Sequence, residues 1–146
     1  GITQDQASFR QQIEPLVDSA QVRYIGPVDP QARNQLLGGA AALLHPIRFA
    51  EPFGLSVAEA MLCGTPVIAC PLGSMRELIL DKETGFMVDD VRQAAEATGR
   101  LGTLSRLRCH QWAAAQFSQE KMISDYLTVY ENILGGAFSN RVKAWK

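Results

Sequence analysis

The sequence predicts an α/β fold in which a parallel sheet is covered by helices on both faces. Between residues 22 and 88, short apolar stretches alternate with segments of helical spacing, and this alternation is typical of parallel sheets. The last third of the chain, from Val91, has helical spacing only. With 146 residues, of which 47% are hydrophobic and 20% charged, the chain is long enough to bury the core of one domain.

The elements are predicted in a definite order. An initial helix is expected to begin near Asp5 and to be kinked or ended by Pro15. Its apolar positions are Phe9, Ile13, Leu16 and Val17. Strands are then expected at about 22–25, 41–45, 66–69 and 86–88, alternating with helices near 29–38, 55–63 and 74–80.

The helical last third is predicted to contain helices near 91–101 and 103–116 and a final helix. Ser118 is the expected N-cap of this final helix, with Glu120 in its first turn. The final helix has one apolar stripe, made of Ile123, Tyr126, Leu127, Tyr130, Ile133 and Leu134. The stripe either packs on its own domain or docks elsewhere, and both interpretations stay open. The domain is expected to span residues 1–134, followed by a loose tail over 135–146.

Two glutamates, Glu51 and Glu59, flank a loop that runs directly into the helix expected from Leu55. Without a Cβ at Gly54, the first N–H groups of that helix can be approached by a phosphate at the positive end of the helix dipole. Glu59, about one turn further on, can accept hydrogen bonds from two neighbouring hydroxyls, as acidic residues do for ribose. Glu51 would face the other side of a diphosphate, where a sugar would lie. A chance pair among 15 acidic residues is the alternative.

The segment around these glutamates resembles glycosyltransferase family 4, the retaining nucleotide-sugar enzymes of the GT-B fold. The segments 22–28, 73–77 and 83–88 are similar to the strand beside the nucleobase, the glycine loop and a later strand of that family. The resemblance covers roughly residues 20–134. Its central motif stands here as Glu51, Phe53, Gly54, Glu59, Ala60, Met61, Gly64, Pro66, Val67, Ile68 and Ala69.

The resemblance implies a role for each matching residue. Glu51 would act in catalysis by positioning the donor sugar and stabilising charge, rather than as an assured nucleophile. Glu59 would bind the ribose hydroxyls and Val28 would lie against the base. The remaining donor-binding residues would be Phe53, Gly54, Leu55, Ser56, Gly73 and Ser74. The resemblance implies no cofactor and no obligatory metal, and the sequence has no His/Cys cluster or paired aspartates at ligand spacing.

The resemblance also implies that the chain is the C-terminal, donor-binding half of a GT-B enzyme, with a Rossmann-like sheet that lacks its first strands. Strand 22–25 would then have no neighbour, and unpaired buried backbone groups each cost about 1–3 kcal/mol. We therefore expect the missing N-terminal part of the same enzyme or a complementing chain as partner, or a dimer. Alone, the chain would be inactive.

Three function classes remain in play. The leading one is transfer of a hexose from a nucleotide-sugar donor to an acceptor hydroxyl with retention of configuration. The alternatives are a non-catalytic nucleotide-binding or assembly module and a nucleotide-sugar epimerase of the GT-B fold. Nothing in the sequence identifies the acceptor, the base or the hexose.

Charge, cysteine content and hydropathy limit the partners and the cellular compartment that the sequence predicts. A net charge of −1 with scattered Arg and Lys gives no basic stripe for nucleic acid. Cys63, Cys70 and Cys109 lack Cys-x-x-Cys spacing, which predicts buried reduced thiols and a cytoplasmic protein. No apolar run is long enough for a transmembrane segment, while peripheral membrane contact stays open. His45, at the end of an expected strand, has a structural role or contacts the donor.

Overall fold

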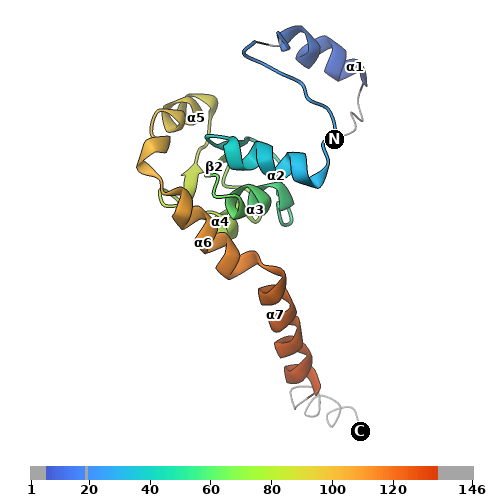
Figure 1. The fold of residues 1–146 in the computed structure, drawn as a ribbon, viewed down its shortest axis with the longest axis vertical. Helices are drawn as coiled ribbons and strands as arrows, with labels where there is room; N and C mark the ends of the chain where they lie inside the picture. Colours follow the sequence, from blue (N-terminus) through green and yellow to red (C-terminus); the bar gives the residue numbers. More distant parts are fainter. Residues whose placement is uncertain (1–5, 19, 135–146) are drawn as a thin grey trace. The chain divides into compact units, whose positions relative to one another are not determined.

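The computed structural model describes residues 6–18 and 20–134. These residues divide into two compact units, one up to Leu36 and one from Leu37. Each unit is described by itself below. The second unit contains the sheet and the motif around Glu51 (Figure 1).

The sheet of the second unit has three parallel strands in the order β1-β2-β3. These are β1 (Leu43–His45), β2 (Val67–Ala69) and β3 (Gly85–Met87). His45 is in register with Ala69, and Ala69 with Met87, so the carboxyl ends of the strands lie along one edge. The predicted parallel sheet and three of its four predicted strands are confirmed.

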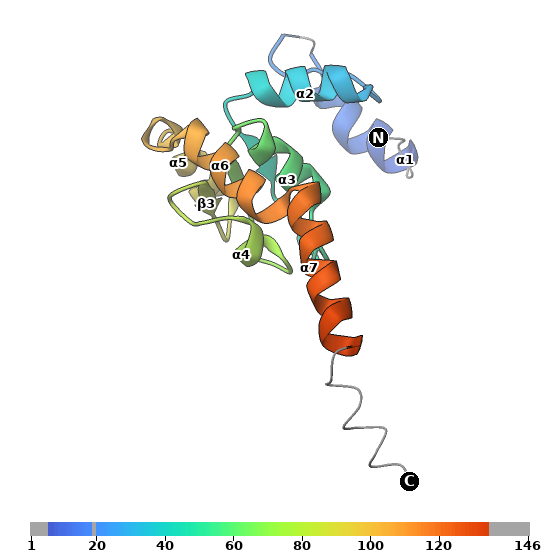
Figure 2. The same cartoon turned by 60° about the horizontal axis from the view of Figure 1, so that its bottom comes forward.

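Helices cover both faces of this sheet. Val67 and Ala69 of β2 belong to a core cluster with residues of α3 (Leu55–Leu62) and α6 (Arg106–Phe117). Ile68 points to the opposite face, where it packs with Phe86 and with Ala97 of α5 (Val91–Thr98). Alternate residues of one strand therefore supply two separate cores, as the period of a strand requires. Figure 2 shows α3 and α6 side by side.

The remaining elements of the second unit follow the predicted order. They are α4 (Met75–Leu78), the 3₁₀ turn η3 (Leu101–Thr103) and α7 (Gln119–Asn132). The helix expected over 91–101 ends at Thr98, and the 3₁₀ turn follows it. The predicted N-cap of α7 is confirmed, because the side chain of Ser118 accepts a hydrogen bond from the Lys121 N–H.

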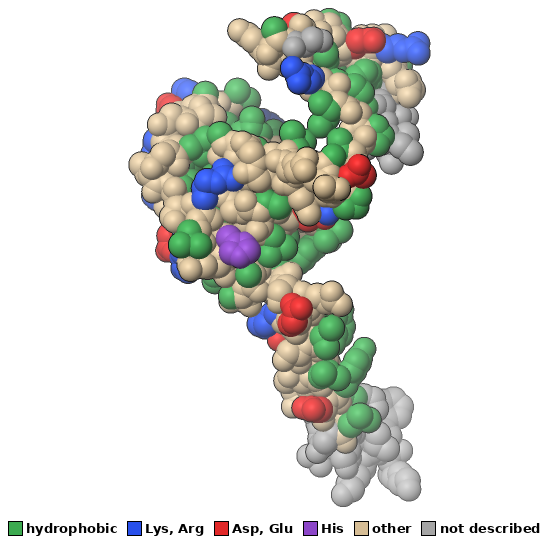
Figure 3. All heavy atoms as spheres, in the orientation of Figure 1, with side chains coloured by type: hydrophobic (Ala, Val, Ile, Leu, Met, Phe, Trp, Pro, Cys, Tyr) green, Lys and Arg blue, Asp and Glu red, His purple; other side chains and the backbone are tan. Residues whose placement is uncertain are grey.

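The apolar stripe predicted for the final helix is exposed; four of its residues lie in α7, and Ile133 and Leu134 directly follow it. Its six residues are between 44% and 87% accessible, and no residue of α7 is buried. Figure 3 shows hydrophobic side chains gathered along one side of this helix. Within the described residues, the interpretation that the stripe packs on its own domain is therefore wrong. No helix in the described ranges is long and apolar enough to span a membrane.

The predicted strand at 22–25 is wrong, because these residues form an irregular segment in the first unit. Val22, Tyr24 and Ile25 are each about half exposed, at 45–49%. A strand needs a neighbour to satisfy its backbone groups, and the sheet of the described residues consists of β1, β2 and β3 alone. The β propensity of the segment is thus not sufficient without a partner.

The first unit contains the predicted initial helix as three short helical segments in succession. These are α1 (Gln6–Ser8), the π-helical η1 (Phe9–Ile13) and the 3₁₀ turn η2 (Glu14–Leu16), which contains Pro15. Asp5 and the tail 135–146 lie outside the described residues. The rings of Phe9 and Tyr24 lie 5.0 Å apart. The helix expected near 29–38 is α2 (Pro30–Gly39), most of which belongs to this unit.

Candidate functional site

The loop after β1 leads into α3 through Gly54, which has φ +89° and acts as the N-cap. The N–H groups of Val57 and Ala58 donate to the Gly54 carbonyl at 3.0 and 3.2 Å and so begin the helix. Leu55 and Ser56 are exposed in the first turn, where N–H groups have no intrahelical acceptor. This helix end can therefore receive an anion.

Gly54 is needed here for a different reason from the one expected. A Cβ on Gly54 would lie 2.7 Å from the Met75 Cε and 3.1 Å from the Leu78 Cδ1, inside the core. Because Gly54 has no side chain, the side chains of α4 can pack against the loop. The left-handed φ is a second reason for glycine at this position. The absence of a side chain does not by itself open a path for a phosphate.

The two glutamates occupy the same segment and are both half-buried. The Glu51 Cγ lies 3.6 Å from the position that a Cβ on Gly54 would take, so this side chain runs beside the beginning of α3. Glu59 lies in the second turn of α3, whose neighbouring residues Ala58 and Ala60 are buried. Val28 belongs to the first unit and is not part of this segment.

The Gly73–Ser74 turn packs directly on the Glu51 loop. A Cβ on Gly73 would overlap the backbone of Ala50 and Glu51, and Gly73 has φ +59°. The Ser74 N–H donates to the Glu51 carbonyl at 3.0 Å, and the Ser74 Oγ donates to the Phe53 carbonyl at 2.6 Å. The structure thus brings together seven of the nine predicted site residues around one loop, namely Glu51, Phe53, Gly54, Leu55, Ser56, Gly73 and Ser74.

An aromatic chain from α6 supports the same loop and was not anticipated from the sequence. The Phe53 and Phe117 rings meet edge to face at 6.1 Å, and those of Phe117 and Trp112 at 6.4 Å. The Trp112 Nε1–H donates to the Leu78 carbonyl at 2.8 Å. No local pattern marks these two residues as part of the site, since the groups that they contact at the loop and at α4, Phe53 and Leu78, lie far away in the sequence.

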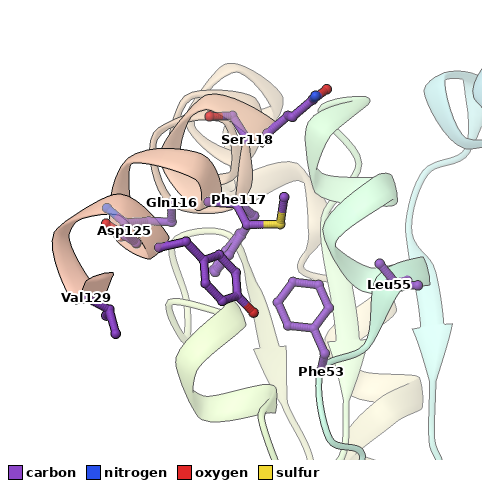
Figure 4. A pocket seen from close by; sticks show the side chains of 10 residues that line it. Phe53, Leu55, Gln116, Phe117, Ser118, Asp125 and Val129 are labelled. Carbon is purple, nitrogen blue, oxygen red and sulfur yellow. The ribbon is translucent and has the colours of Figure 1, made fainter. Parts of the chain in front are cut away.

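A cavity of about 740 Å³ opens beside Phe53 (Figure 4). Its lining is largely apolar and comes from the beginning of α3, the end of α6 and α7. The lining residues are Phe53, Leu55, Gln116, Phe117, Ser118, Gln119, Met122, Asp125, Tyr126 and Val129. A second cavity of about 340 Å³ lies at the carboxyl ends of the strands and is lined in part by Arg48, Cys70 and Asp89.

Several single residues have defined surroundings. Nε2 of His45 is buried and has no hydrogen-bond partner among the described residues, which leaves both interpretations of this residue open. Nδ1 of His110 lies 2.6 Å from the Leu62 carbonyl oxygen at the end of α3. The three cysteines are free, but only Cys109 is buried, while Cys63 and Cys70 are half-buried. Burial raises the pKa of the Cys109 thiol.

No group of three or more His, Cys, Asp or Glu side chains within the described ranges could hold a metal ion. The candidate site is made of the N-terminus of α3, two glutamates and the backbone groups held by the Gly73–Ser74 turn.

The sequence pattern of a family described as Glycosyl transferases group 1 matches residues 1–103. The chain belongs to this family. This member of the glycosyl transferases group 1 is 30% identical over 128 residues to a phosphatidyl-myo-inositol mannosyltransferase of Mycobacterium tuberculosis, covering 80% of this chain. It is 34% identical over 121 residues to a D-inositol 3-phosphate glycosyltransferase of Segniliparus rotundus, covering 77% of this chain.

Two solved structures are similar to the group 1 chain. Sucrose-phosphate synthase from Thermosynechococcus elongatus superposes with a TM-score of 0.74 at 27% identity, over 89% of this chain. HepE from Anabaena, solved in complex with UDP-glucose, superposes with a TM-score of 0.68 over 84% of this chain and, at 24% identity, shows the fold alone. The Rossmann-like α/β fold of GT-B enzymes is confirmed. The chain spans only 27–36% of the length of these four proteins.

Proposed function

We propose that this chain is the donor-binding, C-terminal part of a retaining glycosyltransferase of family 4, which transfers a hexose from a nucleotide sugar to an acceptor hydroxyl. The observation that carries this proposal is the exposed beginning of α3 beside Glu51, held in place by the Gly73–Ser74 turn. Two further findings support the proposal. The relatives named above are glycosyltransferases, and one protein of similar fold was solved with UDP-glucose.

In this proposal the diphosphate of the donor lies at the N-terminus of α3, where the N–H groups of Leu55 and Ser56 and the helix dipole favour negative charge. Phe53 and Gly54 contribute backbone contacts from the loop. Charge that develops on the leaving diphosphate is stabilised by these groups, which are already oriented before the reaction.

Glu51 holds the hydroxyls of the donor sugar and orients its reacting carbon. Its half-buried side chain beside the beginning of α3 supports this role. In a front-face reaction the departing diphosphate takes the proton of the acceptor hydroxyl, so retention does not need a nucleophilic carboxylate. Glu59 binds the ribose hydroxyls, Val28 contacts the base, and the Gly73–Ser74 turn borders the donor site.

The rest of the enzyme comes from the same protein or from a complementing chain. Two exposed apolar surfaces support this proposal. Leu44, on the edge strand β1, is 57% exposed, and the stripe of α7 is uncovered. Covering such surfaces is favourable because apolar area is removed from water.

The test is the steady-state kinetics of the full-length protein with nucleotide sugars. Glu51→Ala is expected to lower kcat by about 100-fold or more, since it removes a group that acts on the reacting sugar. Glu59→Ala is expected to raise the donor KM about tenfold with a smaller change in kcat. Glu96→Ala, on the exposed face of α5, is the control and should leave both constants unchanged.

Near-normal turnover of Glu51→Ala would contradict the proposal. Nucleotide binding without any transfer by the full-length protein would favour a non-catalytic module instead. Interconversion of nucleotide sugars in the absence of an acceptor would favour an epimerase.

A further inference from the structure

We propose that Ser74 is a positioning residue of this site and that its hydroxyl aligns the Glu51 loop rather than capping its own helix. The inference rests on the proposed function for its kinetic consequences. Its structural part stands on the hydrogen bonds alone.

The Ser74 hydroxyl does not make the hydrogen bond that serine hydroxyls at helix N-caps usually make. Ser74 is the N-cap of α4, and such residues normally accept a hydrogen bond from an N–H of the first turn. Asp90, Ser105 and Ser118 do so at α5, α6 and α7. Ser74 makes no such bond, and its Oγ instead donates to the Phe53 carbonyl at 2.6 Å.

The two hydrogen bonds of Ser74 hold the loop on both sides of Pro52. The Ser74 N–H binds the Glu51 carbonyl at 3.0 Å, and the Oγ binds the Phe53 carbonyl. Pro52 between them has its φ restricted by the ring. Two restrained carbonyls with a restricted residue between them leave the backbone of the loop little freedom, so the Cα of Glu51 is held in one place.

The bond to Phe53 also sets the direction of an N–H group. No peptide bond in the described part of the chain is cis. In a planar trans peptide unit, the N–H of Gly54 points opposite to the Phe53 carbonyl. Since that carbonyl is turned toward Ser74, the Gly54 N–H is turned away from it. The hydroxyl thus orients a donor group at the beginning of α3.

Ser74 is itself well placed to act through other residues. It is only 8% exposed, and its hydroxyl is already engaged. Glu51 is about half-buried, and Leu55 and Ser56 are exposed, so these groups can meet a ligand while Ser74 holds them from behind.

The experiment compares Ser74→Ala with Ser105→Ala in the full-length protein. Ser105 is the matched control, because its hydroxyl accepts the Arg108 N–H and caps α6 in the ordinary way. Hydrogen exchange of residues 50–56 is measured without donor, and kcat is measured in the wild-type and Glu51→Gln backgrounds.

We expect Ser74→Ala to accelerate exchange of the loop amides about tenfold and to lower kcat about tenfold, because small displacements of positioned groups are costly. In the Glu51→Gln background the same change should lower kcat less than twofold, since coupled residues are not additive. Ser105→Ala should lower the melting temperature yet leave loop exchange and kcat within twofold.

The inference is overturned if Ser74→Ala leaves loop exchange within twofold of wild type, or if its cost in kcat is the same in both backgrounds. If Ser74→Ala does not fold, Ser74→Cys keeps most of the side-chain volume with a weak donor and is judged by the same criteria. Faster loop exchange in a protein that transfers no sugar would support the structural inference and contradict only the proposed function.

Discussion

Gly73 lies so close to Glu51 that a side chain on Gly73 would overlap the carbonyl oxygen of Glu51. The φ of +59° at Gly73 adds a second reason for glycine, because this conformation is strained for other residues. The turn after β2 and the loop after β1 are therefore in direct contact, and a substitution in either one should disturb the structure of both.

Gly73→Ala should lower the free energy of unfolding of the full-length protein by about 3 kcal/mol, because left-handed strain and overpacking add together. Denaturant unfolding monitored by circular dichroism measures this. Gly102→Ala is the control, since a Cβ there meets nothing within 4 Å and its φ is not positive. Equal stability of the two variants would show that the close contact with Glu51 is not restrictive.

Arg106→Ala should lower the free energy of unfolding by about 1–2 kcal/mol. This value is at the lower end for charge-assisted hydrogen bonds because Arg106 is exposed. Its guanidinium donates to the carbonyls of Gly38 and Ala40 at 2.6 Å and to the Thr65 Oγ1 at 3.1 Å. Arg106→Lys should recover only part of the loss, since lysine cannot reproduce this fork. Thermal unfolding measures both variants.

The control for Arg106 is Arg92→Ala. Arg92 forms an ion pair with Glu96 one turn further along the same helix, and both side chains are more than 60% exposed. Such surface pairs contribute about 0.5 kcal/mol or less. A loss at Arg92 as large as that at Arg106 would contradict the role assigned to the three hydrogen bonds.

Lys82→Gly should stabilise the protein by about 1 kcal/mol, because Lys82 has φ +66° and glycine adopts this conformation without strain. The backbone N–H of Lys82 donates to the Gly85 carbonyl at 2.7 Å, and this bond remains in the variant. Lys82→Ala keeps the strain and should give no gain. A melting temperature that rises equally in both variants would exclude strain as the cause.

The Cys109 thiol should make stability fall at alkaline pH. Burial raises the pKa of this thiol above its ordinary value of 9.0, so the unfolded chain loses the proton first as pH rises. The contribution is complete below about pH 9 and is lost as pH rises from there through the folded pKa. Chemical denaturation at pH 8 and pH 10 measures it, and Cys109→Ala should show a smaller decrease than wild type.

The order of the elements could be predicted because it depends on local signals. The apolar spacing that ends in His45, the Pro52–Gly54 break before α3 and the cap at Ser118 each lie within a few residues of the structure that they specify. The prediction at 22–25 was wrong because a strand exists only with a neighbour, and local composition cannot supply one.

The candidate site was predictable in part for the same reason. Glu51, Gly54 and Glu59 lie in one continuous segment, so their proximity follows from the chain itself. The roles of Ser74, Phe117 and Trp112 depend on contacts with Phe53 and Leu78, which lie far from them in the sequence, and no periodicity marks such contacts.

The chain's local pattern thus determined where the helices and strands lie and which segment carries the two glutamates. Only tertiary packing decided that Gly54 is needed because α4 packs against it. Tertiary packing also decided that the Ser74 hydroxyl donates to the Phe53 carbonyl and does not cap α4. The physical reason is that spacing and capping act over a few residues. Steric exclusion and hydrogen-bond choice instead depend on whichever atoms the fold brings within about 3–4 Å.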